Sequence, residues 1–217
     1  VLSAMTTGNT FKDELLFYTD NYSSVKKLFK NKLTRLRDQG MEKLVIDMRN
    51  NMGGYDEAGI ALCELLTNDD YFASGLGKRV GGEYVSLRSK HIHGSGEFAD
   101  LDVVVLTNFN CISGGDVTLN YLLKLENVTV AGLTDPNGSA QMTGGCCVLA
   151  DGLVTVNYPI SLTLDLKGEP NIDTRADRIS RDPVDVRIPF TLSAAMMMFD
   201  QGIDYELNWA VNYLNKT

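Results

Sequence analysis

The chain has little of several things that would point to particular protein classes. None of its apolar runs approaches the roughly 18 residues of a membrane-spanning helix. Basic residues are not in excess, because 20 Lys and Arg stand against 28 Asp and Glu, a net charge of −8. This balance argues against nucleic acid or an anionic membrane surface as the partner.

Cysteine and histidine are also scarce, with four and two residues among 217. Cys63, Cys111, Cys146 and Cys147 match no zinc-binding spacing, and adjacent cysteines rarely bridge each other, so we interpret all four as buried free thiols. No metal or cofactor is implied. With 44% hydrophobic and 22% charged residues, the chain can bury a full core, and we expect one domain over residues 1–217.

The chain is organised around Leu44–Gly54, which reads Leu-Val-Ile-Asp-Met-Arg-Asn-Asn-Met-Gly-Gly. Its apolar start predicts a short buried strand, and its glycine pair predicts a sharp turn before a helix that begins near Asp56. Free backbone amides at such a turn can hold a developing negative charge. Many α/β turns look like this and bind nothing, so this unit alone does not indicate a site.

A second unit of the same kind follows. Residues 101–107 predict another buried strand, which leads through residues 108–112 to Ser113-Gly114-Gly115-Asp116 and an apolar-periodic helix. A hydroxyl therefore lies where a strand ends and a helix begins, and the positive pole of that helix faces whatever the hydroxyl attacks. A serine there can also be a simple helix cap. Together the two units supply the parts of an acyl-transfer site.

The other expected elements alternate between helix and strand. Helices are predicted at 23–38, 56–67 and 200–214, a strand at 128–132, a hairpin with an Asp-Gly turn at 147–156, and a strand at 160–166. Residues 68–100 are polar and glycine-rich, and we expect them to be mostly loop, with one strand at 83–88. The β-α-β-α-β order predicts an α/β fold with a twisted, mostly parallel sheet flanked by helices.

The two blocks carry a resemblance. Leu44–Gly54 resembles the "hydrophobic-D-L-R-N-N-P-G-G" block of the tail-specific, or C-terminal processing, serine proteases, a family that includes the tricorn core and retinoid-binding relatives. Residues 103–116 are similar to the family's "V-V-V-L-x-N-x-x-x-A-S-A-S-E", and 128–132 match its next strand, "A-x-V-V-G". The resemblance covers about residues 40–190 and implies a crotonase/ClpP-like fold.

The resemblance also implies roles for individual residues. Ser113 falls on the nucleophile of the family's S-A-S-E. The oxyanion hole would then be formed by the amide of Gly114 with that of Gly53 or Gly54. These glycines also have a purely structural role as turn formers, and both roles can hold.

The general base is harder to place. Most members of the family use a lysine in "F-G-K-G", but the equivalent residues 135–141 contain none. The tricorn-like branch uses a histidine and the carboxylate of "G-x-x-I-E", which falls on Asp173, with Glu169 as the second choice. In that branch the histidine precedes a peptide-binding module, so we expect this chain to be the C-terminal part of a longer one that carries both. His91 and His93 are the alternatives within the chain.

The resemblance implies a serine-type endopeptidase that acts on polypeptides, with substrates paired as extended chains to a sheet edge. As a fragment without its histidine, the chain would be inactive. A different class, a non-catalytic binding module on the same fold, is favoured by the missing lysine. An acyl-CoA enzyme of the related crotonase fold has less support. The sequence does not indicate an oligomeric state, and the bacterial relatives suggest an exported or cell-envelope protein.

Overall fold

A four-stranded parallel sheet forms the centre of the computed structural model, which describes residues 2, 22–140, 142–172 and 183–216. Its strands are β1 (Lys43–Asp47), β4 (Asp102–Leu106), β5 (Val128–Gly132) and β8 (Val186–Arg187), in the order β1-β4-β5-β8. Every neighbouring pair is parallel, so β1, β4 and β5 all end at one edge of the sheet.

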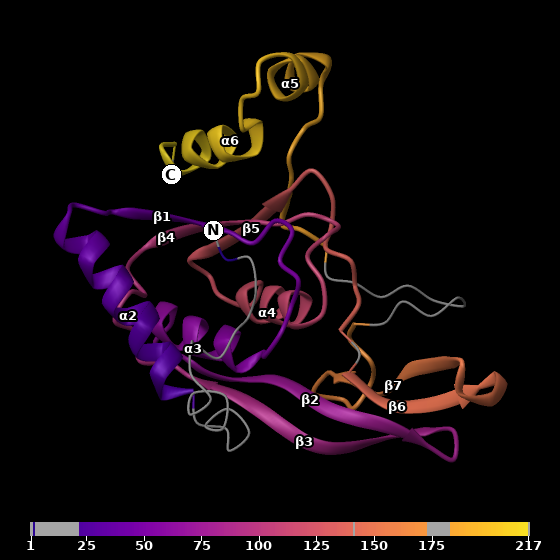
Figure 1. Cartoon of the computed structure of the whole chain (residues 1–217). Helices are drawn as coiled ribbons and strands as arrows, with labels where there is room; N and C mark the ends of the chain where they lie inside the picture. Colours follow the sequence, from indigo (N-terminus) through magenta and orange to yellow (C-terminus); the bar gives the residue numbers. More distant parts are fainter. Residues whose placement is uncertain (1, 3–21, 141, 173–182, 217) are drawn as a thin grey trace.

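Helices cover both faces of this sheet (Figure 1). Val103 and Val105 of β4 belong to one apolar cluster, with α3 (Glu57–Leu66) and α4 (Gly114–Leu122). Val104 and Leu106 belong to a second cluster, with α6 (Tyr205–Leu214). The alternation follows the two-residue period of a strand that is buried on both sides. The predicted α/β fold with a parallel sheet flanked by helices is confirmed.

Helix α2 (Ser23–Asp38) lies outside α3 and matches the predicted range. Its apolar residues are only partly buried: Val25 and Leu33 are buried, whereas Leu28 and Leu36 are 48% and 38% exposed. Gly40, with a φ of 91°, follows the helix, and its amide donates to the carbonyl of Arg37. Glycine commonly ends a helix in this way, because it takes a positive φ without strain.

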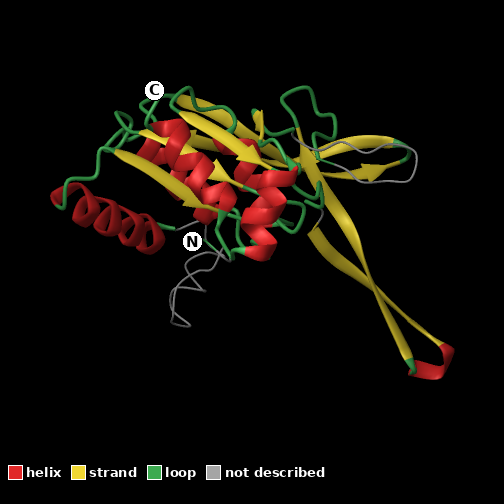
Figure 2. Ribbon diagram, turned by 90° about the horizontal axis from the view of Figure 1, so that it is seen from above, coloured by secondary structure: helices red, strands yellow, loops and turns green. Residues whose placement is uncertain are grey.

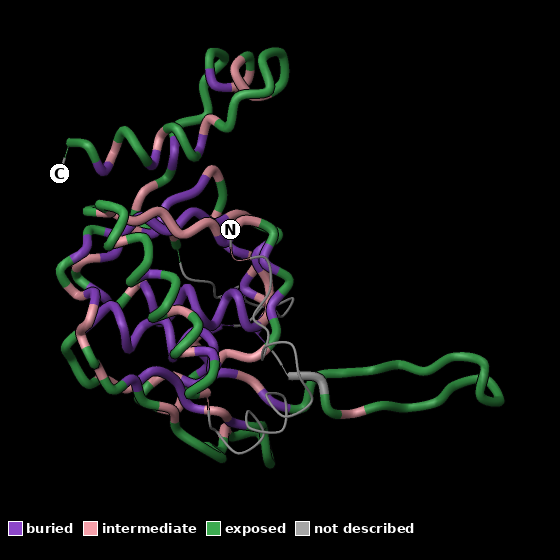
Figure 3. The backbone as a smooth tube through the Cα atoms, turned by 60° about the vertical axis from the view of Figure 1, so that its left-hand side comes forward, coloured by how far each residue is buried: buried purple, intermediate pink, exposed green. Residues whose placement is uncertain are grey.

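A second, antiparallel sheet has the order β3-β2-β7-β6. Its strands are β2 (Asp70–Val80), β3 (Glu83–His93), β6 (Met142–Leu149) and β7 (Val154–Leu164), and a short 3-10 turn, η1 (Ala150–Gly152), joins β6 to β7. Figure 2 shows the β6–β7 hairpin as an arm that projects from the body. Figure 3 shows the arm exposed along nearly its whole length.

The expectation of a loop over 68–100 was wrong, because β2 and β3 fill most of this segment. Gly81 and Gly82 form their connection, with φ angles of 61° and 100°, as a two-residue hairpin turn requires. Position 77 within β2 needs glycine, because a Cβ there would overlap the side chain of Leu164 on β7. The separate strand expected at 160–166 is the end of β7, which already begins at Val154.

The C-terminal region contains two elements that the sequence did not indicate, α5 (Leu192–Ala195) and the π-helical turn η2 (Met196–Asp200). Helix α6 begins at Tyr205 rather than near Asp200. Its start is fixed by Asp204, whose carboxylate accepts the amide of Leu207 at 3.0 Å. Within the described ranges, no helix has both the length and the apolar character needed to cross a membrane.

Candidate active site

Ser113 occupies the junction between β4 and α4 in a conformation that is rare for a residue with a side chain. Its φ is 55° and its ψ is −122°, and it is the residue before the first turn of α4. A positive φ in a non-glycine residue stores backbone strain, which the surrounding structure has to offset. The hydroxyl makes no capping hydrogen bond to α4, a helix that the structure describes in full. Ser113 is therefore not a simple helix cap.

The glycine turn after β1 lies directly against Ser113. A Cβ on Gly53, whose φ is 79°, would be 2.6 Å from the Cβ of Ser113 and 2.9 Å from the nitrogen of Gly114. A Cβ on Gly114 would be 2.5 Å from the carbonyl oxygen of Gly54. All three separations are shorter than real side chains allow, so glycine is needed on both sides. The structure thus brings together four of the predicted site residues: Ser113, Gly114, Gly53 and Gly54.

The amides of these glycines differ in what they can bind. The amide of Gly53 donates to Oδ1 of Asn51 at 2.9 Å and is therefore already used. The amides of Gly54 and Gly114 have no hydrogen-bond acceptor among the described residues. Gly114 also opens helix α4, where the helix dipole is positive. Among the described residues, the amides of Gly114 and Gly54 therefore differ from that of Gly53 in having no acceptor.

Asn51 joins the two turns, a role that the sequence analysis did not give it. The residue is fully buried, and its carbonyl oxygen accepts the amide of Ile112 at 3.0 Å. Its side-chain amide donates to the carbonyl of Leu2 at 2.6 Å. A Cβ on Gly115 would be 2.9 Å from Oδ1 of Asn51. In the sequence, the only feature that could have indicated this role is the position of Asn51 as the second asparagine of the Arg-Asn-Asn block.

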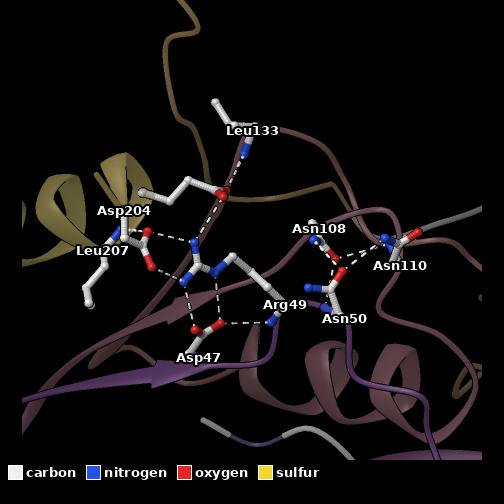
Figure 4. A network of polar contacts seen from close by, with 9 residues as sticks. Asp47, Arg49, Asn50, Asn108, Asn110, Leu133, Asp204 and Leu207 are labelled. Carbon is white, nitrogen blue, oxygen red and sulfur yellow. Dashed lines mark hydrogen bonds and ion pairs between the residues drawn. The ribbon is translucent and has the colours of Figure 1, made fainter. Parts of the chain in front are cut away.

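Arg49 anchors the end of β1 to the C-terminal helix (Figure 4). Its guanidinium contacts Asp47 at 2.8 Å, Asp204 at 2.7 Å and Glu206 at 3.2 Å. The hydrogen bonds to Asp47 and Asp204 raise the pKa of Arg49 despite its partial burial. Burial raises the pKa of Asp47, but the hydrogen bonds and charge of Arg49 outweigh it and lower that pKa overall. The hydrogen bond from Arg49 also lowers the pKa of Asp204.

Three asparagines link the same turn to the loop before Ser113 (Figure 4). Asn50, with a φ of 59°, donates its backbone amide to Oδ1 of Asn108 at 3.0 Å. Its own Oδ1 accepts the side-chain amides of Asn108 at 3.1 Å and Asn110 at 2.9 Å. These bonds hold the loop after β4 against the turn after β1, and so fix Ser113 relative to the glycine pair.

Neither histidine of the chain is among the neighbours of this site. His91 and His93 are exposed residues on β3, and the buried Ile92 between them faces the core. Their ring centroids lie 6.4 Å apart, and the ring centroid of His91 lies 5.7 Å from that of Phe72 on β2. His93 is 3.4 Å from Asp70. The two rings thus interact with each other and with β2, and the structure does not bring them to Ser113.

Of the two predicted carboxylates, the structure describes only Glu169. Asp173 lies outside the described residues. Glu169 is exposed in the turn after β7, where its backbone amide donates to Oδ1 of Asp165 at 2.9 Å. Cys111, two residues before Ser113, is fully buried, and burial raises the pKa of its thiol to about 12, so it does not compete as a nucleophile.

Comparison with known proteins identifies the protein family to which this chain belongs. The family model of peptidase family S41 matches residues 9–177, and the chain therefore belongs to this family. Membership supports a serine peptidase function. No curated protein matches the chain.

Several solved structures share the fold. A putative peptidase from Parabacteroides merdae has a TM-score of 0.69 at 16% identity, with 98% of this chain and 59% of that one covered. The mature form of the protein CPAF has a TM-score of 0.61 at 15% identity, over 89% of this chain and 45% of its own. A photosystem II D1 C-terminal processing protease has a TM-score of 0.56 at 20% identity, with 93% of this chain and 46% of that one covered. The chain thus spans about half the length of these relatives.

Proposed function

We propose that this chain is the catalytic part of a serine peptidase that cleaves peptide bonds in polypeptides. The observation that carries the proposal is the contact between the strained Ser113 turn and the glycine turn of residues 53 and 54. Membership of peptidase family S41 supports the same reaction. A hydroxyl beside two backbone amides that bind no acceptor among the described residues suits attack on a carbonyl carbon.

In this mechanism Ser113 Oγ attacks the peptide carbonyl while a base removes its proton. The carbonyl oxygen becomes an oxyanion, which the amides of Gly114 and Gly54 stabilise with help from the dipole of α4. The C–N bond then breaks, the base returns the proton to the leaving amine, and an ester to Ser113 remains. Water hydrolyses this ester by the same steps, which releases the acid and regenerates the hydroxyl.

We infer that the base is a histidine supplied by a part of the protein outside these 217 residues. His91 and His93 interact with each other and with β2, and residues 135–141 contain no lysine. Asp173 is proposed to orient the incoming histidine, with Glu169 as the alternative. The substrate is proposed to be an extended polypeptide that pairs with a sheet edge.

A fluorophosphonate probe tests the proposal, because it phosphonylates activated serines. In the protein that carries its complete chain, we expect covalent labelling that maps to Ser113 by mass spectrometry and disappears in Ser113→Ala. Ser193→Ala is the matched control, because Ser193 is exposed on α5 and remote from the glycine turns. Labelling at another serine, with Ser113 unmodified, would overturn the assignment of the nucleophile.

A non-catalytic binding module on the same fold is the second candidate. It is favoured by one observation, namely that the described residues place neither a histidine nor a lysine against Ser113. This candidate predicts that the folded full-length protein remains unlabelled and leaves an unfolded substrate such as casein intact. Cleavage of casein that depends on Ser113 would exclude it.

A further inference from the structure

Asp116 is buried at the start of α4, three residues after Ser113, and is only 2% exposed. Its two carboxylate oxygens accept two consecutive backbone amides, from Gly138 at 3.0 Å and Ser139 at 2.9 Å. A carboxylate is an acceptor on both oxygens and can take both amides at once. Asp116 therefore fixes the 138–139 loop to the helix that Ser113 opens.

The same loop returns a hydrogen bond to the nucleophile. The carbonyl oxygen of Ser139 accepts the backbone amide of Ser113 at 2.7 Å. Asp116, Ser139 and Ser113 thus form a closed ring of main-chain and side-chain contacts. An acidic residue at the third helical position usually reaches back to the amide before the helix. Here the amide of Ser113 bonds to Ser139 instead, and the carboxylate of Asp116 supports the loop that provides this acceptor.

The 138–139 loop is also tied to the segment before Ser113. The backbone amide of Asn137 donates to the carbonyl of Cys111 at 3.1 Å, and its side chain donates to the carbonyl of Phe109 at 3.2 Å. These two bonds do not involve Asp116. Loss of the carboxylate should therefore leave the loop in place and disturb mainly the contact between Ser139 and Ser113.

We propose that Asp116 is a positioning residue that holds Ser113 in its strained, reactive conformation through the 138–139 loop. The proposal rests on the peptidase function proposed above. A φ of 55° persists in Ser113 only while its surroundings offset the strain, and the Ser139 carbonyl contributes one of the hydrogen bonds that do so. Asp116 itself touches no reacting atom.

Asp116→Asn tests the proposal, because an amide of the same shape keeps one acceptor oxygen and presents an N–H group to the other backbone amide. In the full-length protein we expect the rate of fluorophosphonate labelling to fall by about 10- to 100-fold, as for other losses of active-site preorganisation. The fall should lie in the covalent step, with probe binding unchanged. Glu64→Gln is the control, because Glu64 is also a buried carboxylate, only 4% exposed, but lies near the end of α3. It accepts a hydrogen bond from the hydroxyl of Tyr22 and pairs with Lys26 of α2.

Hydrogen exchange provides a readout that does not need activity. Asp116→Asn should speed exchange at the amides of Ser113 and Ser139, whereas Glu64→Gln should not. The proposal would be overturned if Asp116→Asn left exchange at the Ser113 amide unchanged. It would also be overturned if the parent is labelled and Asp116→Asn is labelled at the same rate. If the parent itself is not labelled, the peptidase assignment fails, and exchange alone decides whether Asp116 orders Ser113.

A second variant covers the case in which Asp116→Asn does not fold. Gly138 has a φ of 81°, so Gly138→Ala strains the same loop without removing the carboxylate. We expect labelling to slow by about 3- to 10-fold, because the acceptor for the Ser113 amide is displaced. Labelling at the parental rate in this variant would contradict the proposed role of the loop.

Discussion

Gly53 and Ser113 lie so close that a methyl group on Gly53 would be 2.6 Å from the Cβ of Ser113. The two residues are 60 positions apart in the chain, yet they form one surface at the end of the parallel sheet, because β1 and β4 are neighbours and end together. This edge is where ligands bind in open α/β sheets. The central claim of the proposed function depends on this contact.

The first prediction concerns that contact. Gly53→Ala should lower the free energy of unfolding by about 2 to 4 kcal/mol, because the new methyl group clashes with Ser113 and alanine disfavours a positive φ. Urea denaturation measures this change. Gly82→Ala is the control, with a φ of 100° and no atom within 4 Å of the added Cβ, and should cost only about 1 kcal/mol. Equal losses in both variants would show that the contact contributes nothing.

The second prediction concerns the anchor of α6. Arg49→Met should destabilise the protein by about 2 to 4 kcal/mol, because it leaves the carboxylates of Asp47 and Glu206 without their cation in a mostly buried place. Lys30→Met removes an exposed pair with Glu97 and should cost less than about 1 kcal/mol. Thermal unfolding of the two variants under one set of conditions gives the comparison. A loss for Arg49→Met no larger than that for Lys30→Met would contradict the anchor.

The third prediction is the pH dependence of that anchor. The pKa values of Asp47 and Asp204 are lowered in the folded protein. Stability that comes from a lowered carboxyl pKa is fully present above the unfolded value of about 4 and is lost as pH falls through the folded value. The difference in urea midpoint between the parent and Arg49→Met should therefore shrink as the pH is lowered from about 5 to about 2. This range runs from about one unit above to about two units below the unfolded carboxyl pKa. A difference that stays constant over this range would refute the pairing.

The fourth prediction concerns the thiols. The expectation of four buried thiols was wrong for Cys146 and Cys147, which are exposed on the β6–β7 arm. Cys63 and Cys111 are buried, and burial raises the pKa of each to about 12. Reaction with a thiol reagent at pH 8 should modify the exposed pair quickly and the buried pair only after unfolding. Peptide mapping identifies the modified residues. Rapid modification of Cys111 in the native protein would mean that the Ser113 turn opens.

The parallel half of the fold follows from the sequence because its signals are local. Strands β1 and β4 are apolar runs, and each leads into a glycine turn and a helix, which is the pattern of a parallel sheet. The prediction of a buried strand holds for β4, whereas the residues of β1 are only half-buried. Ser113 and the glycines beside it were identified by the same two blocks. Order along the chain is enough to place these residues at one sheet edge.

The antiparallel half could not be predicted in the same way. Gly75 and Gly77 look like loop residues in the sequence, but they are in β2 because the chain must approach Leu164 of β7 closely. That reason lies almost ninety residues away. The Gly81-Gly82 pair was a usable hairpin signal, but the polar residues around it suggested a loop.

The supporting residues of the site also depend on distant partners. Nothing near Arg49 in the sequence indicates that it binds Asp204 and Glu206, and nothing near Asp116 indicates the 138–139 loop. Such contacts join residues that become neighbours only after folding. Spacing along the chain can suggest a nucleophile, but it does not reveal what holds the nucleophile in place.

The most direct test of the account is a crystal structure of the full-length protein after reaction with a fluorophosphonate. The account predicts a phosphonyl group on Ser113 Oγ, with its oxygen about 2.7 to 3.1 Å from the amide nitrogens of both Gly114 and Gly54. A phosphonyl oxygen that points to solvent, or contacts neither amide, would contradict the claim that the two glycine-bounded turns form one oxyanion-binding site.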